Sequence, residues 1–470
     1  MFSDHRELLR WLEQSEIQFV DLLYVNLFGG VHHVTLPVSR VKDRLFVEGV
    51  GVDGSSVPGF KKLESGDVSA IPDPTTAWID PTTAHPTLAV LCDIVEADTK
   101  VPLAGYPREV ARRAEAYLTR TGHATRSVWG PEFEYYLFDE VTHACSPTGA
   151  SFQVHSRERA SGLGDAPSVR QQRGYHASRP ADRLHDVRSE TVRVLEKMGV
   201  PVVYHHHEVG ALGQVEFEIE MRGLLQSGDA VIKGKLAAKL VAQQHGMVAT
   251  FMPKPLFGQA GTGMHFHQHL FMGEAPLFYQ QGTYADLSPL ALSYTAGLLD
   301  HGGALLALTN PSTNSYRRLV PGFEAPIKAF FSLGNRSAAI RVPRYAIAPL
   351  EKRIEFRPPD ATANPYLAMA AMLMAGIDGI ERQLDPTAMG FGPFDANVEH
   401  LPQAERDAIT SLPSTLEQAT AALREDHDFL LRGGVFPPSL LDSWLHGLTE
   451  NAQALARRPH PFEYDLYLDV

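Results

Sequence analysis

Cysteine is scarce in this sequence, since the 470 residues include only Cys92 and Cys145. Two cysteines cannot build a disulfide framework or a thiolate metal site, which excludes the disulfide-rich class of small domains. Long hydrophobic runs are also missing, because the longest, from Tyr366 to Ile377, is too short to cross a bilayer. The charged N-terminus lacks the apolar segment of a signal peptide. These absences predict a cytoplasmic protein that does not enter membranes.

Positive charge is in the minority: 42 Lys and Arg residues stand against 55 Asp and Glu residues, a formal net charge of −13. An acidic chain is repelled by phosphate backbones and anionic lipids, so nucleic acid and membrane surfaces are not expected partners. Hydrophobic residues make up 44% of the chain, which is enough for a large core. The composition therefore indicates a globular protein of enzyme size.

Several common catalytic motifs are absent as well. The sequence contains no GxxxxGK[ST] phosphate loop, no HExxH zinc motif and no GxSxG nucleophile turn. A GxGxxG pattern occurs at Gly49, Gly51 and Gly54, but Pro58 and Gly59 follow where a dinucleotide-binding fold would begin a helix. We therefore expect no Rossmann domain.

Strands and turns dominate the first hundred residues. Residues 18–37 form two apolar runs around a Gly-Gly pair, the pattern of a β-hairpin. A helix is predicted from Pro107 to just before Gly122. Later strands return at irregular intervals without regular strand–helix alternation, which favours an α+β fold with an antiparallel sheet. We place a small domain at residues 1–103 and a large domain at residues 104–470.

Charged residues alternate along several predicted strands. Side chains two positions apart point to one face of a strand, so each alternating set would line a single face of the sheet. The sets are Glu132 and Glu134; His265, His267 and His269; and Arg353, Glu355 and Arg357, while Glu208 and Glu216 flank a turn. Burial of an unpaired charge is expensive, so this face is not an ordinary core. It is either solvated or it holds ions.

The residue types leave three interpretations open. A solvated outer face would explain any one of these residues. Oxygen-rich ligands suit Mg²⁺ or Mn²⁺, and arginines beside such ions suit phosphoryl transfer, which indicates a metal- and nucleotide-dependent enzyme. Alternating histidines could instead hold Zn²⁺ in a hydrolase, although that interpretation leaves five carboxylates unexplained.

Longer segments, taken in order, resemble the class I glutamine synthetase family almost from end to end. The matching segments are VDGSSVPGF, GPEFEYYLFD, HHHEVGALGQVE, FMPKPLFGQAGTGMHFH, NPSTNSYRRLVPGFEAP, NRSAAIRVP, RIEFRPPDATANPY and PHPFEYDLYLDV. The resemblance implies an N-terminal β-grasp-like domain and a catalytic domain with a curved antiparallel sheet flanked by helices. It also implies a homo-oligomer, a dodecamer of two hexameric rings, in which a neighbouring N-terminal domain completes each active site.

The resemblance implies a reaction and its metal ligands. ATP would phosphorylate the γ-carboxylate of glutamate, and ammonia would displace phosphate from γ-glutamyl phosphate to give glutamine. Two or three Mg²⁺ or Mn²⁺ ions per subunit are implied. The ligands of two ions follow from motif positions: Glu134, Glu208 and Glu216 for one, and Glu132, His265 and Glu355 for the other.

Motif positions imply further roles. Arg336 and Arg357 would stabilise the transferring phosphoryl group, and Gly261 and Arg318 would bind glutamate. His267, Arg341 and Arg353 would lie on the nucleotide side. The ammonium pocket would comprise Asp53, Ser56, Tyr175 and Glu208. Glu324 would belong to a flap that shields the acyl phosphate from water, and it and Asp53 would act in catalysis.

Departures from the family pattern bear on the acceptor. Ala260 replaces an asparagine that helps to bind glutamate, and His269 replaces a nucleotide-side serine. Glu399 occupies the position of a tyrosine that many class I enzymes adenylylate, so we do not expect that control. The intact ammonium pocket favours ammonia. Ala260 and the missing tyrosine favour the alternative, a γ-glutamyl ligase that uses a polyamine, a monoamine or ethanolamine.

Overall fold

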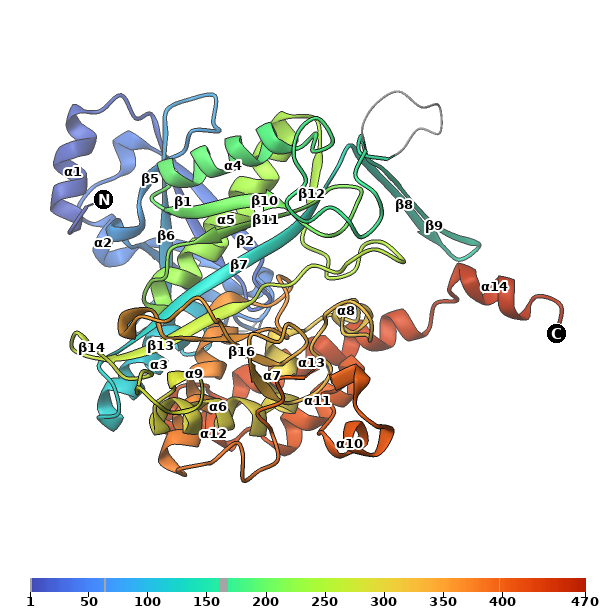
Figure 1. The fold of residues 1–470 in the computed structure, drawn as a ribbon. Helices are drawn as coiled ribbons and strands as arrows, with labels where there is room; N and C mark the ends of the chain where they lie inside the picture. The colour runs from blue at the N-terminus through green and yellow to red at the C-terminus, as the bar shows by residue number, and fades with distance from the viewer. Residues whose placement is uncertain (1, 63–64, 160–167, 397) are drawn as a thin grey trace.

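The computed structural model describes residues 2–62, 65–159, 168–396 and 398–470, apart from the side chain of Glu399. The absence of a tyrosine near Glu399 remains an observation on the sequence alone. Two large sheets, a separate two-stranded sheet and a layer of helices organise the described chain (Figure 1). The fold is α+β, as the sequence predicts.

The first sheet is a six-stranded mixed sheet with strand order β2-β1-β6-β4-β3, in which β5 also pairs with β6. Its strands are β1 (Phe19–Val25), β2 (Val31–Pro37), β3 (Val50–Asp53), β4 (Asp67–Pro72), β5 (Trp78–Ile79) and β6 (Thr87–Glu96). The predicted hairpin is present as the antiparallel pair β1–β2. β1 also pairs in parallel with β6, a long-range pairing that local pattern does not reveal. Helices α1 (His5–Gln14) and α2 (Leu45–Glu48) contribute to the core of this sheet.

The second sheet has nine strands, ordered β10-β11-β7-β13-β17-β16-β15, with β12 paired to β7 and β14 paired to β13. Its strands are β7 (Arg126–Phe138), β10 (Val202–His207), β11 (Gln214–Ile219), β12 (Val248–Thr250), β13 (Phe266–Met272), β14 (Ala275–Pro276), β15 (Phe331–Leu333), β16 (Ile340–Val342) and β17 (Ile354–Phe356). The pairs are antiparallel except β15–β16, which is parallel at one edge. The expected antiparallel sheet is therefore present, with one parallel pair.

Helices pack against this sheet and against one another. They are α3 (Pro107–Thr121), α4 (His185–Lys197), α5 (Leu224–Gln244), α6 (Pro289–Asp300), α7 (Gly302–Thr309), α8 (Ser315–Arg318), α9 (Pro365–Glu381), α10 (Gln403–Ala408), α11 (Leu416–Glu425), α12 (Asp428–Leu431) and α13 (Pro438–Ala456). The longest apolar run of the sequence forms α9, which is buried from Pro365 to Ile380 among the other helices. Within the described part of the chain, no helix is long and apolar enough to cross a membrane.

Two elements extend away from the body (Figure 1). One is the hairpin of β8 (Glu140–Ser146) and β9 (Gly149–His155), and the other is the C-terminal helix α14 (Pro461–Tyr467). Large apolar side chains of α14 are exposed, among them Phe462 and Tyr467. An apolar helix without intramolecular packing is typical of a segment that another chain covers.

Candidate active site

Successive side chains of β7 point alternately to a buried core face and to a charged face of the sheet. Phe133 and Tyr135 are buried and contact the ring of Phe217 on β11, with ring centroids 4.7 and 6.0 Å apart. Glu132 and Glu134 therefore point to the opposite face of the sheet, where they line a cavity. The aromatic core thus fixes the direction of both carboxylates.

The register of the neighbouring strands places carboxylates directly opposite one another. Glu134 on β7 pairs with Glu216 on β11, and Glu132 pairs with Glu218. On the other side of β11, Glu216 pairs with His206 of β10. Like charges directly across a sheet are destabilising. Basic side chains or bound cations are therefore needed to offset the repulsion between these carboxylates.

The cavity over this face has a volume of about 820 Å³. It brings together most of the residues that the sequence predicts for the site: Glu132, Glu134, Tyr175, Glu208, Glu216, Gly261, His265, Arg318, Glu324, Arg336, Arg341, Arg353, Glu355 and Arg357. His267 lies just behind the lining, with its Nε2 atom 2.8 Å from Glu132. Asp53 and Ser56 do not line the cavity. Asp53 ends strand β3 of the first sheet, and the hydroxyl of Ser56, in the short 3-10 helix that follows, donates to Asp53 at 2.6 Å.

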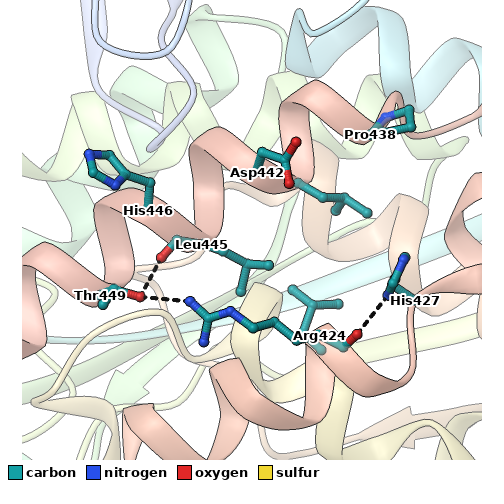
Figure 2. Close-up of a pocket in the computed structure, with 9 residues that line it drawn as sticks. Arg424, His427, Pro438, Asp442, Leu445, His446 and Thr449 are labelled. Atoms are coloured by element: carbon teal, nitrogen blue, oxygen red, sulfur yellow. Dashed lines mark hydrogen bonds between the residues drawn. The ribbon is translucent and has the colours of Figure 1, made fainter.

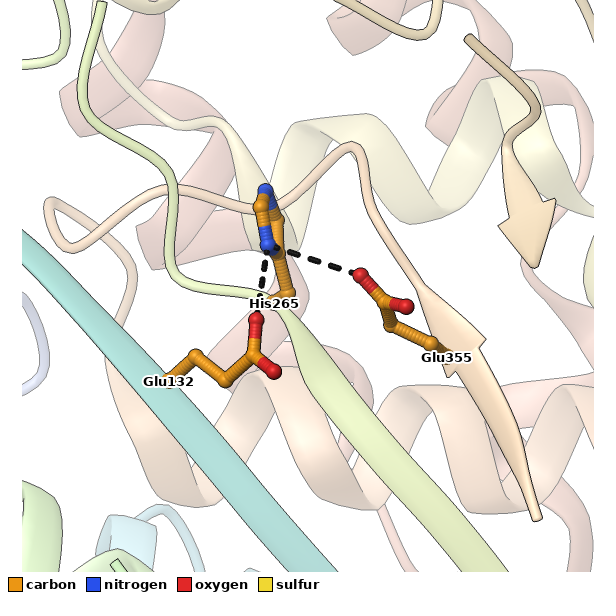
Figure 3. A group of neighbouring side chains, drawn as sticks. All are labelled: Glu132, His265 and Glu355. Atoms are coloured by element: carbon orange, nitrogen blue, oxygen red, sulfur yellow. Dashed lines mark hydrogen bonds and ion pairs between the residues drawn. The ribbon is translucent and has the colours of Figure 1, made fainter. Parts of the chain in front are cut away.

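At one end of the cavity, acidic side chains have basic partners (Figure 3). The Nδ1 atom of His265 lies 3.1 Å from Glu132 and 3.6 Å from Glu355. Burial acts against ionisation of Glu355, but Arg357 and, to a lesser extent, Arg341 outweigh it and lower its pKa to about 2. Burial is likewise outweighed at Glu132, where the nearby His267 and His265 lower the pKa. Three ligand atoms of Glu132, His265 and Glu355 lie close enough to share one cation.

At the other end, the nearest basic group lies farther from the acidic side chains. Burial and the charge of Glu134 raise the pKa of Glu208 to about 7. Burial and the neighbouring glutamates raise the pKa of Glu216 well above its ordinary value. His206 is the nearest basic group, 3.8 Å from Glu208 and 3.7 Å from Glu216, and the three could together hold a cation. A divalent cation would remove the repulsion that produces both shifts.

Close backbone packing shapes the cavity beside Glu134. A Cβ atom at Gly261 would lie 2.7 Å from the Arg318 side chain and from the Pro253 carbonyl, so this position requires glycine. The guanidinium of Arg318 donates to the carbonyls of Pro358 and Arg357 at 2.6 and 3.1 Å. These bonds fix a buried arginine at the wall of the cavity, where it can bind a carboxylate.

A loop and an aromatic ring also line the cavity. Residues 322–325 of this loop, called the flap below, line the cavity, and Glu324 within it has φ of +54°, which an L-residue adopts at an energetic cost. Tyr175 is about half exposed, and the Arg336 guanidinium lies 6.0 Å from its ring centroid. Tyr175 and Glu208 therefore share this side of the cavity with Arg336.

Sequence reasoning missed two potential metal ligands of the site, His206 and Glu218. Glu218 lies opposite Glu132, and the atoms of Glu132, Glu218 and His267 form a further potential cation site. The signal was available, because Glu218 follows Glu216 by two positions and His206 precedes Glu208 by two. His269 lies on the same strand as His267, but it is buried against Phe271 and Phe278.

A smaller cavity of about 400 Å³ lies between α11 and α13 (Figure 2). Its polar side chains include Arg424, His427, Asp442 and His446. Within the described residues these form no group of three potential metal ligands. The large cavity is therefore the candidate active site.

Comparisons with known proteins agree with this geometry. The family models "Glutamine synthetase, beta-Grasp domain" and "Glutamine synthetase, catalytic domain" match residues 16–97 and 104–467. Glutamine synthetases of Frankia alni and of Nostoc sp. are 42% and 41% identical to this chain, and each match covers at least 99% of both chains. The cryo-electron microscopy structure of Plasmodium falciparum glutamine synthetase superposes with a TM-score of 0.90 at 26% identity over 99% of both chains. A GmaS/ADP complex superposes with a TM-score of 0.82 at 25% identity over 100% of both chains.

Proposed function

The chain belongs to the glutamine synthetase family and is a glutamate–ammonia ligase, and we propose that the large cavity is the site of this reaction. The enzyme uses ATP to join ammonia to the γ-carboxylate of glutamate, with γ-glutamyl phosphate as intermediate. The observation that carries the assignment of the site is the pairing of Glu134 with Glu216 and of Glu132 with Glu218 across adjacent strands. Members of this family use ATP and divalent metal ions; the carboxylates of the cavity suit the metal ions and its arginines suit the phosphates of ATP.

The donor set supports two or three Mg²⁺ or Mn²⁺ ions per subunit. We assign Glu134, Glu208 and Glu216 to one ion and Glu132, His265 and Glu355 to another. His206 and Glu218 are further potential ligands beside these residues. When bound, the ions neutralise phosphate and carboxylate charge and so assist phosphoryl transfer.

The arginines distinguish the glutamate end of the cavity from the nucleotide end. Arg318 and the backbone at Gly261 bind the α-carboxylate end of glutamate, because both lie at the wall beside Glu134. We assign His267, Arg341 and Arg353 to the nucleotide side, where Arg353 donates to His267 at 3.3 Å and Arg341 donates to Glu355 at 2.5 Å. Arg336 and Arg357 then stabilise the transferring phosphoryl group between the two substrates.

Ammonium capture takes place beside Glu208. Glu208 and Tyr175 hold the ammonium ion, and a carboxylate takes its proton before the nitrogen attacks the acyl phosphate. Glu324 covers the intermediate and excludes water. We assign Asp53 and Ser56 to the same pocket of a neighbouring subunit, since within one chain they do not line the cavity: Asp53 ends β3 and Ser56 lies in the short 3-10 helix that follows it.

This shared site requires a homo-oligomer, which we propose is a dodecamer of two hexameric rings. The exposed apolar side chains of α14 supply a surface for contacts between subunits. We also propose that the small domain spans residues 1–103 and the catalytic domain residues 104–470. Co-assembly of an Asp53→Ala chain with a Glu216→Gln chain should restore part of the activity, because a mixed interface contains one intact site; failure to restore it would argue against a shared site.

The acceptor is tested by phosphate release from ATP in the presence of glutamate and one amine at a time. Ammonium should support turnover, whereas putrescine, spermidine, ethylamine and ethanolamine should not. Use of a larger amine in place of ammonium would contradict the assignment of the acceptor. Metal content by mass spectrometry should give Mg²⁺ or Mn²⁺ rather than stoichiometric Zn²⁺.

A further inference from the structure

A lysine outside the cavity contacts the flap. Lys254 lies in the loop between β12 and β13, and its ammonium nitrogen is 3.8 Å from the ring centroid of Phe323. Phe323 is the flap residue next to Glu324, and its side chain lines the cavity. A cation at this distance over an aromatic face is attracted by the ring quadrupole.

Lys254 is itself held in place by the parts of the chain that surround the glutamate side. Its backbone N–H donates to the Asn314 side chain at 2.7 Å, and the Asn314 amide donates back to the Lys254 carbonyl at 3.1 Å. Its ammonium group also donates to the carbonyl of Gln259. Asn314 directly precedes α8, which carries Arg318, and Gln259 lies two residues before Gly261. The lysine therefore joins both glutamate-binding elements to the flap.

The flap needs such an anchor. Gly322 and Glu324 both have positive φ angles, +91° and +54°, and only the first of these positions carries a glycine. A glutamate in this region of conformational space costs energy and stays there only when its surroundings hold it. Phe323 lies between the two residues, so a contact on its ring acts directly on the conformation of Glu324.

We propose that Lys254 is a positioning residue that holds the flap over the cavity through the ring of Phe323. This inference rests on the proposed role of Glu324 as the shield of γ-glutamyl phosphate. When the contact is lost, water reaches the intermediate, its oxygen attacks the γ-carbonyl carbon, and the carbon–oxygen bond to phosphate breaks. Water supplies the hydroxyl of the regenerated glutamate, so ATP is consumed without formation of glutamine.

The test compares phosphate release with glutamine formation at saturating ATP, glutamate and Mg²⁺ and limiting ammonium. The wild-type enzyme should release about one phosphate per glutamine. Loss of a cation–π contact worth about 1 kcal/mol changes the population of the closed flap about fivefold. Lys254→Met should therefore increase about fivefold the phosphate release that is not accompanied by glutamine formation. Lys254→Arg should retain coupling, because a guanidinium also binds an aromatic face.

The partner residue provides a second route. Phe323→Leu should uncouple the reaction as Lys254→Met does, Phe323→Tyr should not, and the double variant should be no worse than either single variant. Phe323 lies on the flap, so Phe323→Leu remains informative if Lys254→Met fails to fold. Lys328→Met is a matched control, because Lys328 follows the flap but binds Ile409 and Ser411 instead. It should leave the ratio unchanged.

The outcomes separate this inference from the function on which it rests. A wild-type enzyme that makes no glutamine would overturn the proposed function. Normal coupling in Glu324→Ala would overturn the role of the flap. Uncoupling by Glu324→Ala but not by Lys254→Met or Phe323→Leu would overturn the role of Lys254 alone, as would additive effects in the double variant.

Discussion

Two groups of buried carboxylates in this chain differ in the source of their positive charge. In the cavity, Glu208 and Glu216 face other carboxylates, and their pKa values are raised by burial and by that repulsion. In the helical layer, Asp378 of α9 has three basic partners at 2.8 Å: His301, Arg382 and Arg432. Burial acts against ionisation of Asp378, but these partners outweigh it and lower its pKa to about 2.

The source of the positive charge indicates the role of each group of carboxylates. A buried acid whose cation comes from the same chain is part of the fold, since the pair is complete once the chain has folded. A buried acid that lacks an internal cation destabilises the fold until a ligand supplies one. The cavity therefore carries a cost in stability that the helical layer does not, and perturbation of the two groups should have opposite consequences.

The largest expected effect is on turnover. Glu216→Gln should lower kcat by at least about a thousandfold, because it removes a ligand of the metal that assists catalysis. In metal-free protein the same change should raise the free energy of unfolding, since a neutral amide removes carboxylate repulsion. Steady-state assays and denaturation in EDTA measure both quantities. Retained activity, or a less stable metal-free variant, would contradict the assignment.

The opposite result is expected in the helical layer. Asp378→Asn should lower the free energy of unfolding by about 3–5 kcal/mol, because it leaves three cations without their shared anion. At temperatures where the variant remains folded, kcat and KM should match those of the wild type. Denaturant titration and steady-state kinetics check the two parts. A change in kcat without loss of stability would remove the distinction between the groups.

The pH dependence of stability sharpens the comparison further. His301 lies 2.8 Å from both Asp378 and Asp426, which outweigh burial and raise its pKa to about 9. A raised histidine pKa stabilises the fold fully below about pH 6.5, and the contribution is lost as pH rises towards 9 and beyond. The loss should reach about 3 kcal/mol. Chemical denaturation between pH 6 and pH 10 should show this slope, and His301→Phe should abolish it.

The smallest expected effect is stabilisation by metal. Mg²⁺ at one hundred times its dissociation constant should raise the free energy of unfolding by about 2.7 kcal/mol. Asp378→Asn should respond to Mg²⁺ as the wild type does, whereas Glu216→Gln should respond less. Thermal denaturation across a Mg²⁺ titration makes the measurement. An equal response in Glu216→Gln would show that the ion binds elsewhere.

Much of the fold could be predicted from local pattern. The hairpin β1–β2 and the helix α3 followed from apolar runs, Gly-Gly and Pro107, because these signals act over a few residues. The parallel pair β1–β6 could not be predicted, since its strands lie about sixty residues apart and pair through packing rather than local preference. The parallel pair β15–β16 was not predicted either, although Phe331 and Ile340 pair across a short stretch of chain, because local pattern does not distinguish parallel from antiparallel pairing.

The candidate site, like the fold, could be predicted from the sequence only in part. Alternation showed that Glu132 and Glu134 share a face, and it could have shown the same for Glu216 and Glu218. It could not show which strands are neighbours or which glutamates oppose each other. The contact between Lys254 and Phe323 had no local signal, because the two residues are brought together only by the loops of the folded domain.

The sequence by itself determined the face on which each charged side chain would lie, because a strand has a period of two. It also determined, through the order of its motifs, the family to which the chain belongs. Only the tertiary structure decided that the basic group nearest to Glu208 and Glu216 is His206, whose pKa is lowered by burial, while Asp378 receives three cations. Pairing of charges depends on distance and burial, and both are set by strand register and helix packing rather than by position along the chain.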